Sequence, residues 1–509
     1  MTVDAAAKAA KADDQNMLDA VHAVVYGHMS IRHATKKYAV VRSTLQRRVH
    51  AMTSKDASPK TESEEPAPPP AMALPTVPEV VKGPYKVINC KVRTMQTAAS
   101  SAIDELSNEM VRAGRPVFKL GLGQSPFPVP DCIVDELKAN AHQRDYLPVA
   151  GLAELRQDIA TWATETLKLP YSKDDVLVGP GTKELLFVLQ TVYYGDLLLP
   201  SPSCTSYAPQ ANIAGRNMIW LPTYAEDRWV LRPSVLEAQC AMDPYAPRIL
   251  ILNSPSNPTG CSYSDSDLQA IAVLAKKYRM LVVSDEIYSD LTYEPHISIS
   301  KYYPEGTIVS GGLSKWCGAG GWRVGFWLFS ASLNWLRQSM LVMASETYTS
   351  VASPIQYAAR RAFVPNCPEL SAYKQKCRRT LQLVAEWCTY QLLKMNILVH
   401  PPQGGFHVFP CFRNYRQKLA ARNIVTDVEM CERLLADTGV AILPGSYFGR
   451  AAHELYARIA FVDFKGEIAM YVIGSEGEYG VNDREGFIRS VCPNLWTAME
   501  LLSKWLQAE

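Results

Sequence analysis

One lysine stands in a segment of the chain that favours covalent chemistry. Lys315 lies within 310–325, the run SGGLSKWCGAGGWRVG, which is rich in glycine and apolar residues and unlike the surroundings of a solvated surface lysine. Desolvation and nearby cations would lower the pKa of its side-chain amine and make it a competent nucleophile. Arg323, eight residues further on, adds a cation that suits a phosphate or a carboxylate.

Other polar groups follow apolar runs, and each has an ordinary structural explanation when taken alone. Asp285 comes just after the apolar run 281–283, where burial of an acid is costly unless a cation meets it, although a helix N-cap would also explain it. The segment 253–260, NSPSNPTG, contains Asn257 and reads as a stiff turn. Residues 179–184, GPGTKE, open a helical pattern whose free N–H groups could bind an anion, although a plain strand-to-helix turn is commoner.

These groups all follow runs that read as buried strands. Such runs occur at 176–178, 197–199, 249–252, 281–283 and 308–309, with segments long enough for helices between them. This alternation predicts an α/β fold in which a mostly parallel sheet is covered on both faces. The chemistry of such sheets lies at the carboxyl ends of the strands, where the polar groups stand.

In their order and spacing these residues resemble the aspartate aminotransferase family of fold-type I pyridoxal-phosphate enzymes. The intervals are 28 residues from Asn257 to Asp285, 30 from Asp285 to Lys315 and eight to Arg323. Further similar runs are KLGLGQSPFPVP (119–130), RDYLPVAGLAELR (144–156), PQGGFHVFP (402–410), GVAILPGSYFG (439–449) and LYARIAFVDF (455–464). The resemblance covers roughly 115–505.

The resemblance implies pyridoxal 5'-phosphate as the cofactor and a catalytic role for three residues. Lys315 would form the Schiff base with the cofactor aldehyde and then move protons between Cα of the substrate and C4′ of the cofactor. Asp285 would pair with the pyridine nitrogen and keep it protonated. Tyr288 and Asn257 would donate to the phenolate oxygen of the ring.

The same resemblance assigns the phosphate and the substrate. Gly181, Thr182 and Lys183 would hold the phosphate at a helix N-terminus, with Arg323 as its bidentate partner. Arg458 would grip the α-carboxylate of the substrate, and Gly121 or Gly123 would let the backbone approach it closely. Tyr146 would reach the phosphate of a neighbouring subunit, because active sites in this family lie at a homodimer interface.

Two positions depart from the family pattern. Cys204 stands in PSPSCTSY where an aromatic residue usually stacks on the cofactor ring, and a thiol stacks far less well, while Tyr207 is retained. Gly312 stands three residues before Lys315, where many members carry a hydroxyl group. The first departure indicates weaker cofactor retention or an altered choice of reaction. The second puts one phosphate contact in doubt.

The function predicted from the resemblance is transfer of an amino group between an L-amino acid and a 2-oxo acid. Two alternatives stay open: a DNA-binding regulator that senses the cofactor or an amino acid, and a pyridoxal-phosphate-dependent lyase or decarboxylase. The amino donor is not readable. No Arg or Lys lies between Arg337 and Arg360, so the second arginine used by one dicarboxylate-specific branch is absent. Aspartate and an aromatic or broad range of amino acids remain equally open.

The first 53 residues read as a small helix-turn-helix unit. Leu18, Val21, Val24 and Val25 recur at helical spacing, Ser30 caps a second helix to Tyr38, and Ser43 caps a third over 44–52. The run at 27–49 resembles the Pipsqueak type of helix-turn-helix. Residues 17–53 could therefore bind DNA, with Gln46, Arg47 and Arg48 facing outward, although a helical bundle with a solvated basic face is the simple alternative.

Composition separates this head from the rest of the 509 residues. The net charge of +2 hides ten basic and five acidic residues in 1–60, against 42 and 45 in 61–509. No apolar run is long enough to cross a membrane, and the N-terminus lacks a signal-peptide pattern. The twelve cysteines show no C-x-x-C spacing and no paired histidines, so no metal site is expected. A cytoplasmic protein is predicted, or a nuclear one if the head binds DNA.

The predicted architecture is an α/β three-layer sandwich with a seven-stranded, mainly parallel sheet, a smaller α+β domain and a short three-helix head. The expected bounds are a head at 1–53, a proline-rich linker at 54–84, a small domain built from 85–129 and 386–509, and a large cofactor-binding domain at 130–385.

Overall fold

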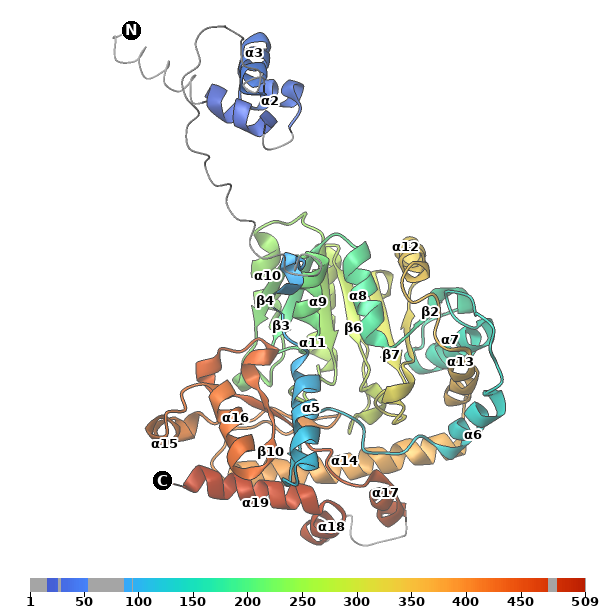
Figure 1. Cartoon of the computed structure of the whole chain (residues 1–509). Helices are drawn as coiled ribbons and strands as arrows, with labels where there is room; N and C mark the ends of the chain where they lie inside the picture. Colours follow the sequence, from blue (N-terminus) through green and yellow to red (C-terminus); the bar gives the residue numbers. More distant parts are fainter. Residues whose placement is uncertain (1–15, 26–28, 54–86, 94, 475–482, 509) are drawn as a thin grey trace, which may run out of the picture. The chain divides into compact units, whose positions relative to one another are not determined.

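The computed structural model describes residues 16–25, 29–53, 87–93, 95–474 and 483–508 (Figure 1). The chain divides into two compact units, Met1–Lys86 and Val87–Glu509, which are described separately. The predicted proline-rich linker at 54–84 lies outside the described residues.

The N-terminal unit contains three helices, as predicted. Residues 16–25 are helical, followed by α2 (Ile31–Lys37) and α3 (Arg42–Thr53), and the turn between the last two passes through Ala39 at a positive φ of 53°. Ser30 caps α2 by accepting a hydrogen bond from the backbone N–H of His33. The predicted cap at Ser43 is wrong, because α3 begins one residue earlier.

The core of this unit is small and apolar. Its buried members are Met17, Ala20, Val21, Ala34 and Leu45. The prediction that Leu18 belongs to this face is wrong: its side chain is 56% exposed, and the neighbouring methionine is buried in its place. A helical period predicts the packed face only to within one residue, since a face about 100° wide admits either neighbour.

The second unit is built on a seven-stranded sheet. Its strands are β2 (Val176–Gly179), β3 (Asp196–Ser201), β4 (Met218–Pro222), β5 (Arg248–Asn253), β6 (Leu281–Asp285), β7 (Thr307–Gly312) and β8 (Gly325–Leu328). The order across the sheet is β2-β8-β7-β6-β5-β3-β4. Only β8 runs antiparallel to its neighbours β2 and β7. The mainly parallel sheet is thus confirmed.

Alternate residues of the central strands face opposite layers of helices. In β5, Ile249 and Ile251 pack toward α8 (Thr182–Val192), α9 (Tyr207–Ala214) and α12 (Asn334–Ser345), whereas Leu250 and Leu252 pack toward α10 (Pro233–Ala241) and α11 (Asp265–Lys277). This is the period-two pattern of a strand buried on both faces. The three-layer sandwich follows from it (Figure 1).

All five strands predicted from apolar runs are present, but two strands were missed. The edge strand β4 has the sequence MIWLP and is only partly buried, so its apolar pattern is weak. The other, β8, directly follows the glycine-rich segment that contains Lys315, and no turn signal separates the two. Its antiparallel direction depends on how the chain turns back between Gly312 and Gly325, and no local sequence pattern shows that direction.

Further helices belong to this unit. They are α6 (Asp131–Asn140), α7 (Ala153–Leu167), α13 (Ser353–Ala359) and the long α14 (Pro368–Lys394). Helices α7, α13 and α14 share one large apolar cluster with residues of β2 and β8. The predicted domain boundary between 385 and 386 falls within α14, which runs across it without a break.

A smaller lobe joins both ends of the unit. Its strands are β1 (Phe118–Lys119), β9 (His407–Val408), β10 (Val440–Ala441), β11 (Leu443–Pro444) and β12 (Ala457–Ala460). Because β1 pairs with β10, the segment before residue 130 lies beside the C-terminal segment, in the arrangement expected for the small domain. Strands β11, β12 and β9 form an antiparallel sheet.

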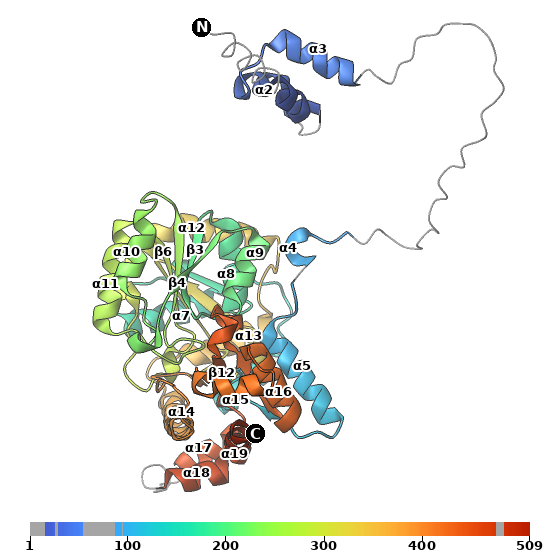
Figure 2. The same ribbon diagram turned by 90° about the vertical axis from the view of Figure 1, so that its left-hand side faces the viewer.

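Further helices come from the two ends of this unit. They are α4 (Cys90–Arg93), α5 (Ala99–Arg112), α15 (Arg416–Ala421), α16 (Asp427–Thr438), α17 (Gly466–Gly474), α18 (Arg484–Val491) and α19 (Pro493–Gln507). The first of them, α4, lies against α9 of the larger lobe. Helices α5 and α16 lie side by side, where Met110 and Leu435 share a small apolar cluster (Figure 2). Among the described residues, no helix is long and apolar enough to cross a membrane.

Candidate active site

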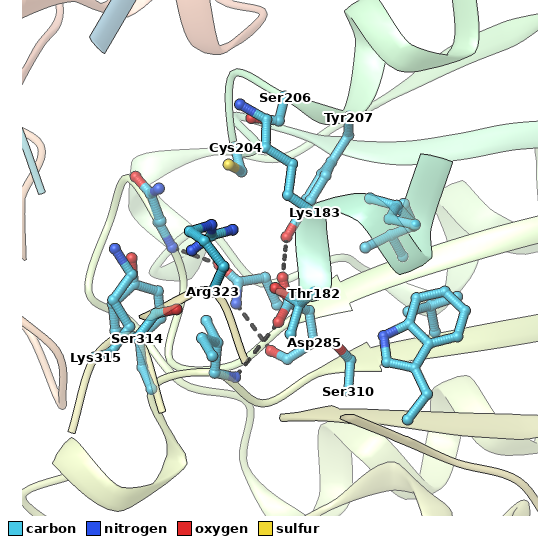
Figure 3. A pocket seen from close by; sticks show the side chains of 18 residues that line it. Thr182, Lys183, Cys204, Ser206, Tyr207, Asp285, Ser310, Ser314, Lys315 and Arg323 are labelled. Carbon is cyan, nitrogen blue, oxygen red and sulfur yellow. Dashed lines mark hydrogen bonds between the residues drawn. The ribbon is translucent and has the colours of Figure 1, made fainter. Parts of the chain in front are cut away.

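A pocket lies at the carboxyl ends of β5, β6 and β7. The strand register aligns Asn253 with Asp285 and Asp285 with Ser310, so three neighbouring strands end at the same edge. The cavity has a volume of about 210 Å³ (Figure 3). Of the residues predicted from the sequence, those that line it are Thr182, Lys183, Cys204, Asn257, Asp285, Tyr288, Lys315 and Arg323.

Lys315 presents a buried amine beside this pocket. Its Nζ donates a hydrogen bond to the backbone oxygen of Gly123 at 2.6 Å, and lies 5.7 Å from the ring centroid of Tyr288. Burial, helped by the nearby cation of Arg458, lowers the pKa of this amine to about 8. Roughly a tenth of the amine is therefore neutral at pH 7, and that form can act as a nucleophile.

Asp285 at the end of β6 is a buried carboxylate held by a tyrosine. Burial raises the pKa of Asp285, and the hydrogen bond from the hydroxyl of Tyr207 to Oδ2, at 2.5 Å, opposes that rise. The sequence pattern retains Tyr207 but assigns it no role. The contact joins residues 78 positions apart in the chain, so no local signal could have shown it.

The N-terminus of α8 forms a cradle for an anion. Gly181 is the N-cap residue, at φ 89° and ψ 157°, and the first hydrogen bonds within the helix run from Glu184 and Leu185 to its oxygen. The N–H groups of Thr182 and Lys183 therefore have no partner within the helix, as is general for a first turn. Such donors, with the positive end of the helix dipole, favour a phosphate.

Arg323 covers this cradle. Its Nη2 donates to the oxygen of Pro180 at 3.3 Å and its Nη1 to the oxygen of Gly320 at 2.9 Å. A Cβ atom on Gly181 would lie 2.2 Å from Nη2 of Arg323, so the cradle admits only glycine at that position. The hydroxyl groups of Ser206 and Ser314 also line the pocket, and sequence analysis missed both (Figure 3).

The glycine at 312 has a steric reason. A Cβ atom on Gly312 would lie 2.8 Å from the backbone oxygen of Val324 in the segment leading to β8. A hydroxyl-bearing side chain at this position would therefore force the two segments apart. The departure from the family pattern follows from the close approach of backbone to backbone.

Arg458 on β12 is a buried arginine whose charge acts on Lys315. It is 3% exposed, its Nη1 donates to Oδ1 of Asn257 at 3.0 Å, and its Nη2 donates to the oxygen of Gly121. Its Nε has no hydrogen-bond partner in the described part of the chain. Burial lowers the pKa of Arg458 to about 10, which still leaves it a cation near neutral pH.

Three further residues predicted for the site are Gly123, Cys204 and Tyr146. The backbone oxygen of Gly123 accepts the hydrogen bond from Lys315. Cys204 is partly exposed and lies on the wall of the pocket (Figure 3). Tyr146 does not line the pocket of its own chain, and its side chain is 91% exposed.

His407 belongs to the run 402–410 that resembles the family, but the sequence gives it no role of its own. It lies on β9, is 1% exposed, and its Nε2 has no hydrogen-bond partner among the described residues. A Cβ atom on Gly123 would lie 2.7 Å from this nitrogen. The two residues are far apart in the sequence, and no spacing connects them.

Comparison with known proteins places the chain among enzymes of one kind. The family model described as "Aminotransferase class I and II" matches residues 115–463, and the model described as "helix-turn-helix, Psq domain" matches residues 13–55. An aspartate aminotransferase of Geobacillus stearothermophilus is 31% identical over 370 residues, which are 70% of this chain and 91% of that protein.

Solved structures agree in fold. An aspartate aminotransferase from Thermus thermophilus with maleate has a TM-score of 0.70 and 24% identity, and the match covers 82% of this chain and 99% of that one. An aromatic aminotransferase from Pyrococcus horikoshii has a TM-score of 0.65 and 26% identity, over 79% of this chain and 98% of that one.

Proposed function

The chain belongs to the aminotransferase class I and II family and is a pyridoxal-phosphate-dependent transaminase, and from this premise we propose a role for each residue of the pocket. The observation that carries the proposal is the buried amine of Lys315, placed between a phosphate cradle at α8 and the cation of Arg458. The substrates are an L-amino acid and a 2-oxo acid.

The residues present fit the cofactor. The glycine-only cradle under Arg323 suits its phosphate, and the buried carboxylate of Asp285 suits a protonated ring nitrogen. When bound, pyridoxal phosphate supplies an aldehyde for the amine and a ring that accepts the electron pair released at the substrate Cα.

Lys315 acts as nucleophile and proton carrier. Its amine is neutral in a useful fraction because burial and Arg458 lower its pKa to about 8. The oxygen of Gly123 orients the lone pair by accepting one N–H. Once the substrate amino group has replaced Lys315 at the cofactor, the same neutral amine would be free to take a proton from Cα of the substrate and to deliver it to C4′ of the cofactor.

Asp285 holds negative charge where a cationic ring nitrogen would need it. Burial raises the pKa of Asp285 and so disfavours its charged form, and the hydrogen bond from Tyr207 lowers the pKa and opposes part of that effect. We expect Asn257 and Tyr288 to donate hydrogen bonds to the phenolate oxygen of the cofactor ring. Asn257 also accepts a hydrogen bond from Arg458 at 3.0 Å, so it would contact both the cofactor and the residue proposed to bind the substrate carboxylate.

Arg458 is the proposed partner of the substrate α-carboxylate. It is buried and charged, and its Nε is unpaired among the described residues, so an arriving carboxylate would gain a charge-assisted hydrogen bond. The amino donor stays open, since the relatives named above act on aspartate in one case and on aromatic substrates in another. A half-reaction screen with single amino acids would identify it.

The test of this function uses the purified full-length chain with pyridoxal phosphate. We expect a visible absorption band that borohydride fixes irreversibly, with the cofactor located on Lys315 by peptide mass spectrometry. Lys315→Ala should show neither result, and identical behaviour of the two proteins would refute the proposal. An amino acid should convert the cofactor to its amine form and release one equivalent of 2-oxo acid. Release of a lyase product or of carbon dioxide would instead favour the alternative reactions.

The N-terminal unit supports a second function, DNA binding. The exposed side chains of Gln46, Arg47 and Arg48 lie on α3, which corresponds to the second helix of the helix-turn-helix pair in the matched family. Because one such unit makes few base contacts, we expect weak and salt-sensitive affinity. A gel-shift with the full-length protein at two salt concentrations tests this. Equal shifts by a variant with alanine at all three positions would count against it.

Homodimer formation and cellular location are further proposals. Tyr146 is exposed and outside its own pocket, which suits a residue that completes the site of a second copy. Mixing Tyr146→Phe with a Lys315→Ala chain should yield hybrid dimers with one intact site, and sedimentation would show the dimer. A tagged full-length chain seen by microscopy would distinguish a cytoplasmic location from a nuclear one.

A further inference from the structure

His407 is a fully buried imidazole to which the roles proposed above give no task. The side chain is 1% exposed, and within the described ranges its Nε2 has no hydrogen-bond partner. A buried polar atom left unpaired carries a desolvation penalty, and nearly all such atoms in proteins find a partner. Its neighbours along β9 and the preceding turn are apolar, including Phe406 and Val408, so phenylalanine would have filled this place without that cost.

The unpaired nitrogen lies against the backbone segment that contacts Lys315. A Cβ atom built on Gly123 would lie 2.7 Å from Nε2 of His407, and the oxygen of the same glycine accepts the hydrogen bond from Nζ of Lys315 at 2.6 Å. On its other side the imidazole packs edge-on against Tyr288, with ring centroids 5.5 Å apart and planes at 86°. His407 thus lies between Gly123, which contacts Lys315, and Tyr288, which lines the pocket.

Charge at this place favours an anionic ligand. Burial, and then the cations of Arg458 and Lys315, hold the pKa of His407 well below its usual range, so the ring is neutral and carries one N–H. Arg458 and His407 lie beside different residues of one backbone segment, since Nη2 of Arg458 donates to the oxygen of Gly121 and Nε2 of His407 abuts Gly123. Nε of Arg458 and Nε2 of His407 both lack a hydrogen-bond partner among the described residues.

We propose that His407 is a substrate-binding residue whose Nε2–H donates a hydrogen bond to the α-carboxylate held by Arg458. The proposal rests on the proposed function of the pocket. It makes carboxylate recognition a task shared by a charged and a neutral donor. It also assigns a ligand to a buried nitrogen that has none in the described part of the chain.

The experiment uses the full-length protein loaded with pyridoxal phosphate. Succinate and 3-phenylpropionate carry carboxylates without an amino group, so the change that they cause in the cofactor spectrum reports carboxylate binding alone. His407→Phe keeps an aromatic ring at this position and removes both ring nitrogens. We expect its Kd for these ligands to rise about tenfold to a hundredfold, as for loss of a hydrogen bond to a charged group.

Two variants separate recognition from folding. His407→Gln keeps an N–H donor near the place of Nε2 and should recover most of the affinity. Tyr293→Phe removes a hydroxyl that donates to the oxygen of Gly405 at 2.9 Å, in the turn that leads to β9, and should leave the Kd unchanged.

The outcomes are distinct. Wild-type affinity in His407→Phe would overturn the proposal, as would failure of the loaded wild-type protein to bind either carboxylate. Equal losses in His407→Gln and Tyr293→Phe would show that the ring only packs the turn, which also contradicts it. If the wild-type protein gave no cofactor band at all, the proposed function itself would fail, which is a different result.

Discussion

Substitution of Gly181 by alanine tests the phosphate cradle at the N-terminus of α8. At φ 89° and ψ 157° this residue lies in a backbone region that only glycine adopts freely, so alanine should cost about 1–3 kcal/mol of stability. The new Cβ would also lie 2.2 Å from Nη2 of Arg323 and would push the guanidinium away. Loss of one charge-assisted hydrogen bond to the phosphate amounts to about 1.5–3 kcal/mol, or about tenfold to a hundredfold in cofactor Kd.

The chain offers a matched control in the same glycine-rich segment. A Cβ atom built on Gly321 meets nothing within 4 Å, so Gly321→Ala should retain wild-type stability and affinity. The assay is a titration of the cofactor-free protein with pyridoxal phosphate, followed by absorbance, together with a thermal melt of each variant. Equal cofactor affinities of Gly181→Ala and Gly321→Ala would refute the assignment of this helix end to the phosphate.

Three further predictions follow from the charges and the cores. In the cofactor-free protein, the rate of reaction with pyridoxal phosphate should rise with pH through about 8, because Lys315 loses its proton there, and Arg458→Met should move that midpoint upward in stopped-flow profiles. Tyr207→Phe removes the hydrogen bond that lowers the pKa of Asp285, so kcat/KM should fall about tenfold and decline further as the pH drops, whereas a flat pH profile would contradict the role. Leu45→Ala, at a fully buried position, should destabilise the N-terminal unit by about 2–5 kcal/mol in calorimetry and leave the transaminase rate unchanged, since the two units are separate.

Local patterns predicted the elements of the sheet better than its connections. The five apolar runs all became strands because a strand buried on both faces needs apolar residues at every position. The antiparallel β8 has the same kind of sequence, and its direction is set by how the chain returns after the lysine segment. In the head, Leu18 and its neighbour compete for one place on the helix, and the packing of α2 and α3 decides between them.

The candidate site also contains residues that the sequence predicts and residues that it does not. Lys315, Asp285 and Arg323 are predictable because their spacing along the chain matches that of the family. Tyr207 and His407 cannot be recognised in this way, because their roles come from contacts made across the fold. Tyr207 contacts the carboxylate of Asp285, 78 positions away, and His407 lies against Gly123 in a distant segment of the chain. An unpaired nitrogen is a property of its surroundings, and the sequence holds no mark of it.

The hydrogen bonds accepted by Gly121 and Gly123 have a consequence for how strongly the enzyme can hold any ligand. Two residues apart, their backbone oxygens accept hydrogen bonds from Arg458 and Lys315, the two groups to which the proposed function assigns the carboxylate and the amino group of an incoming amino acid. The backbone therefore competes with the ligand, and each ligand gains only the difference between its own contacts and those it displaces. We expect modest affinities and rapid product release as a result, and strong discrimination against small anions that cannot reach both side chains at once. Because the competing groups belong to the main chain, side-chain substitution can change this trade-off only by moving the segment that carries them.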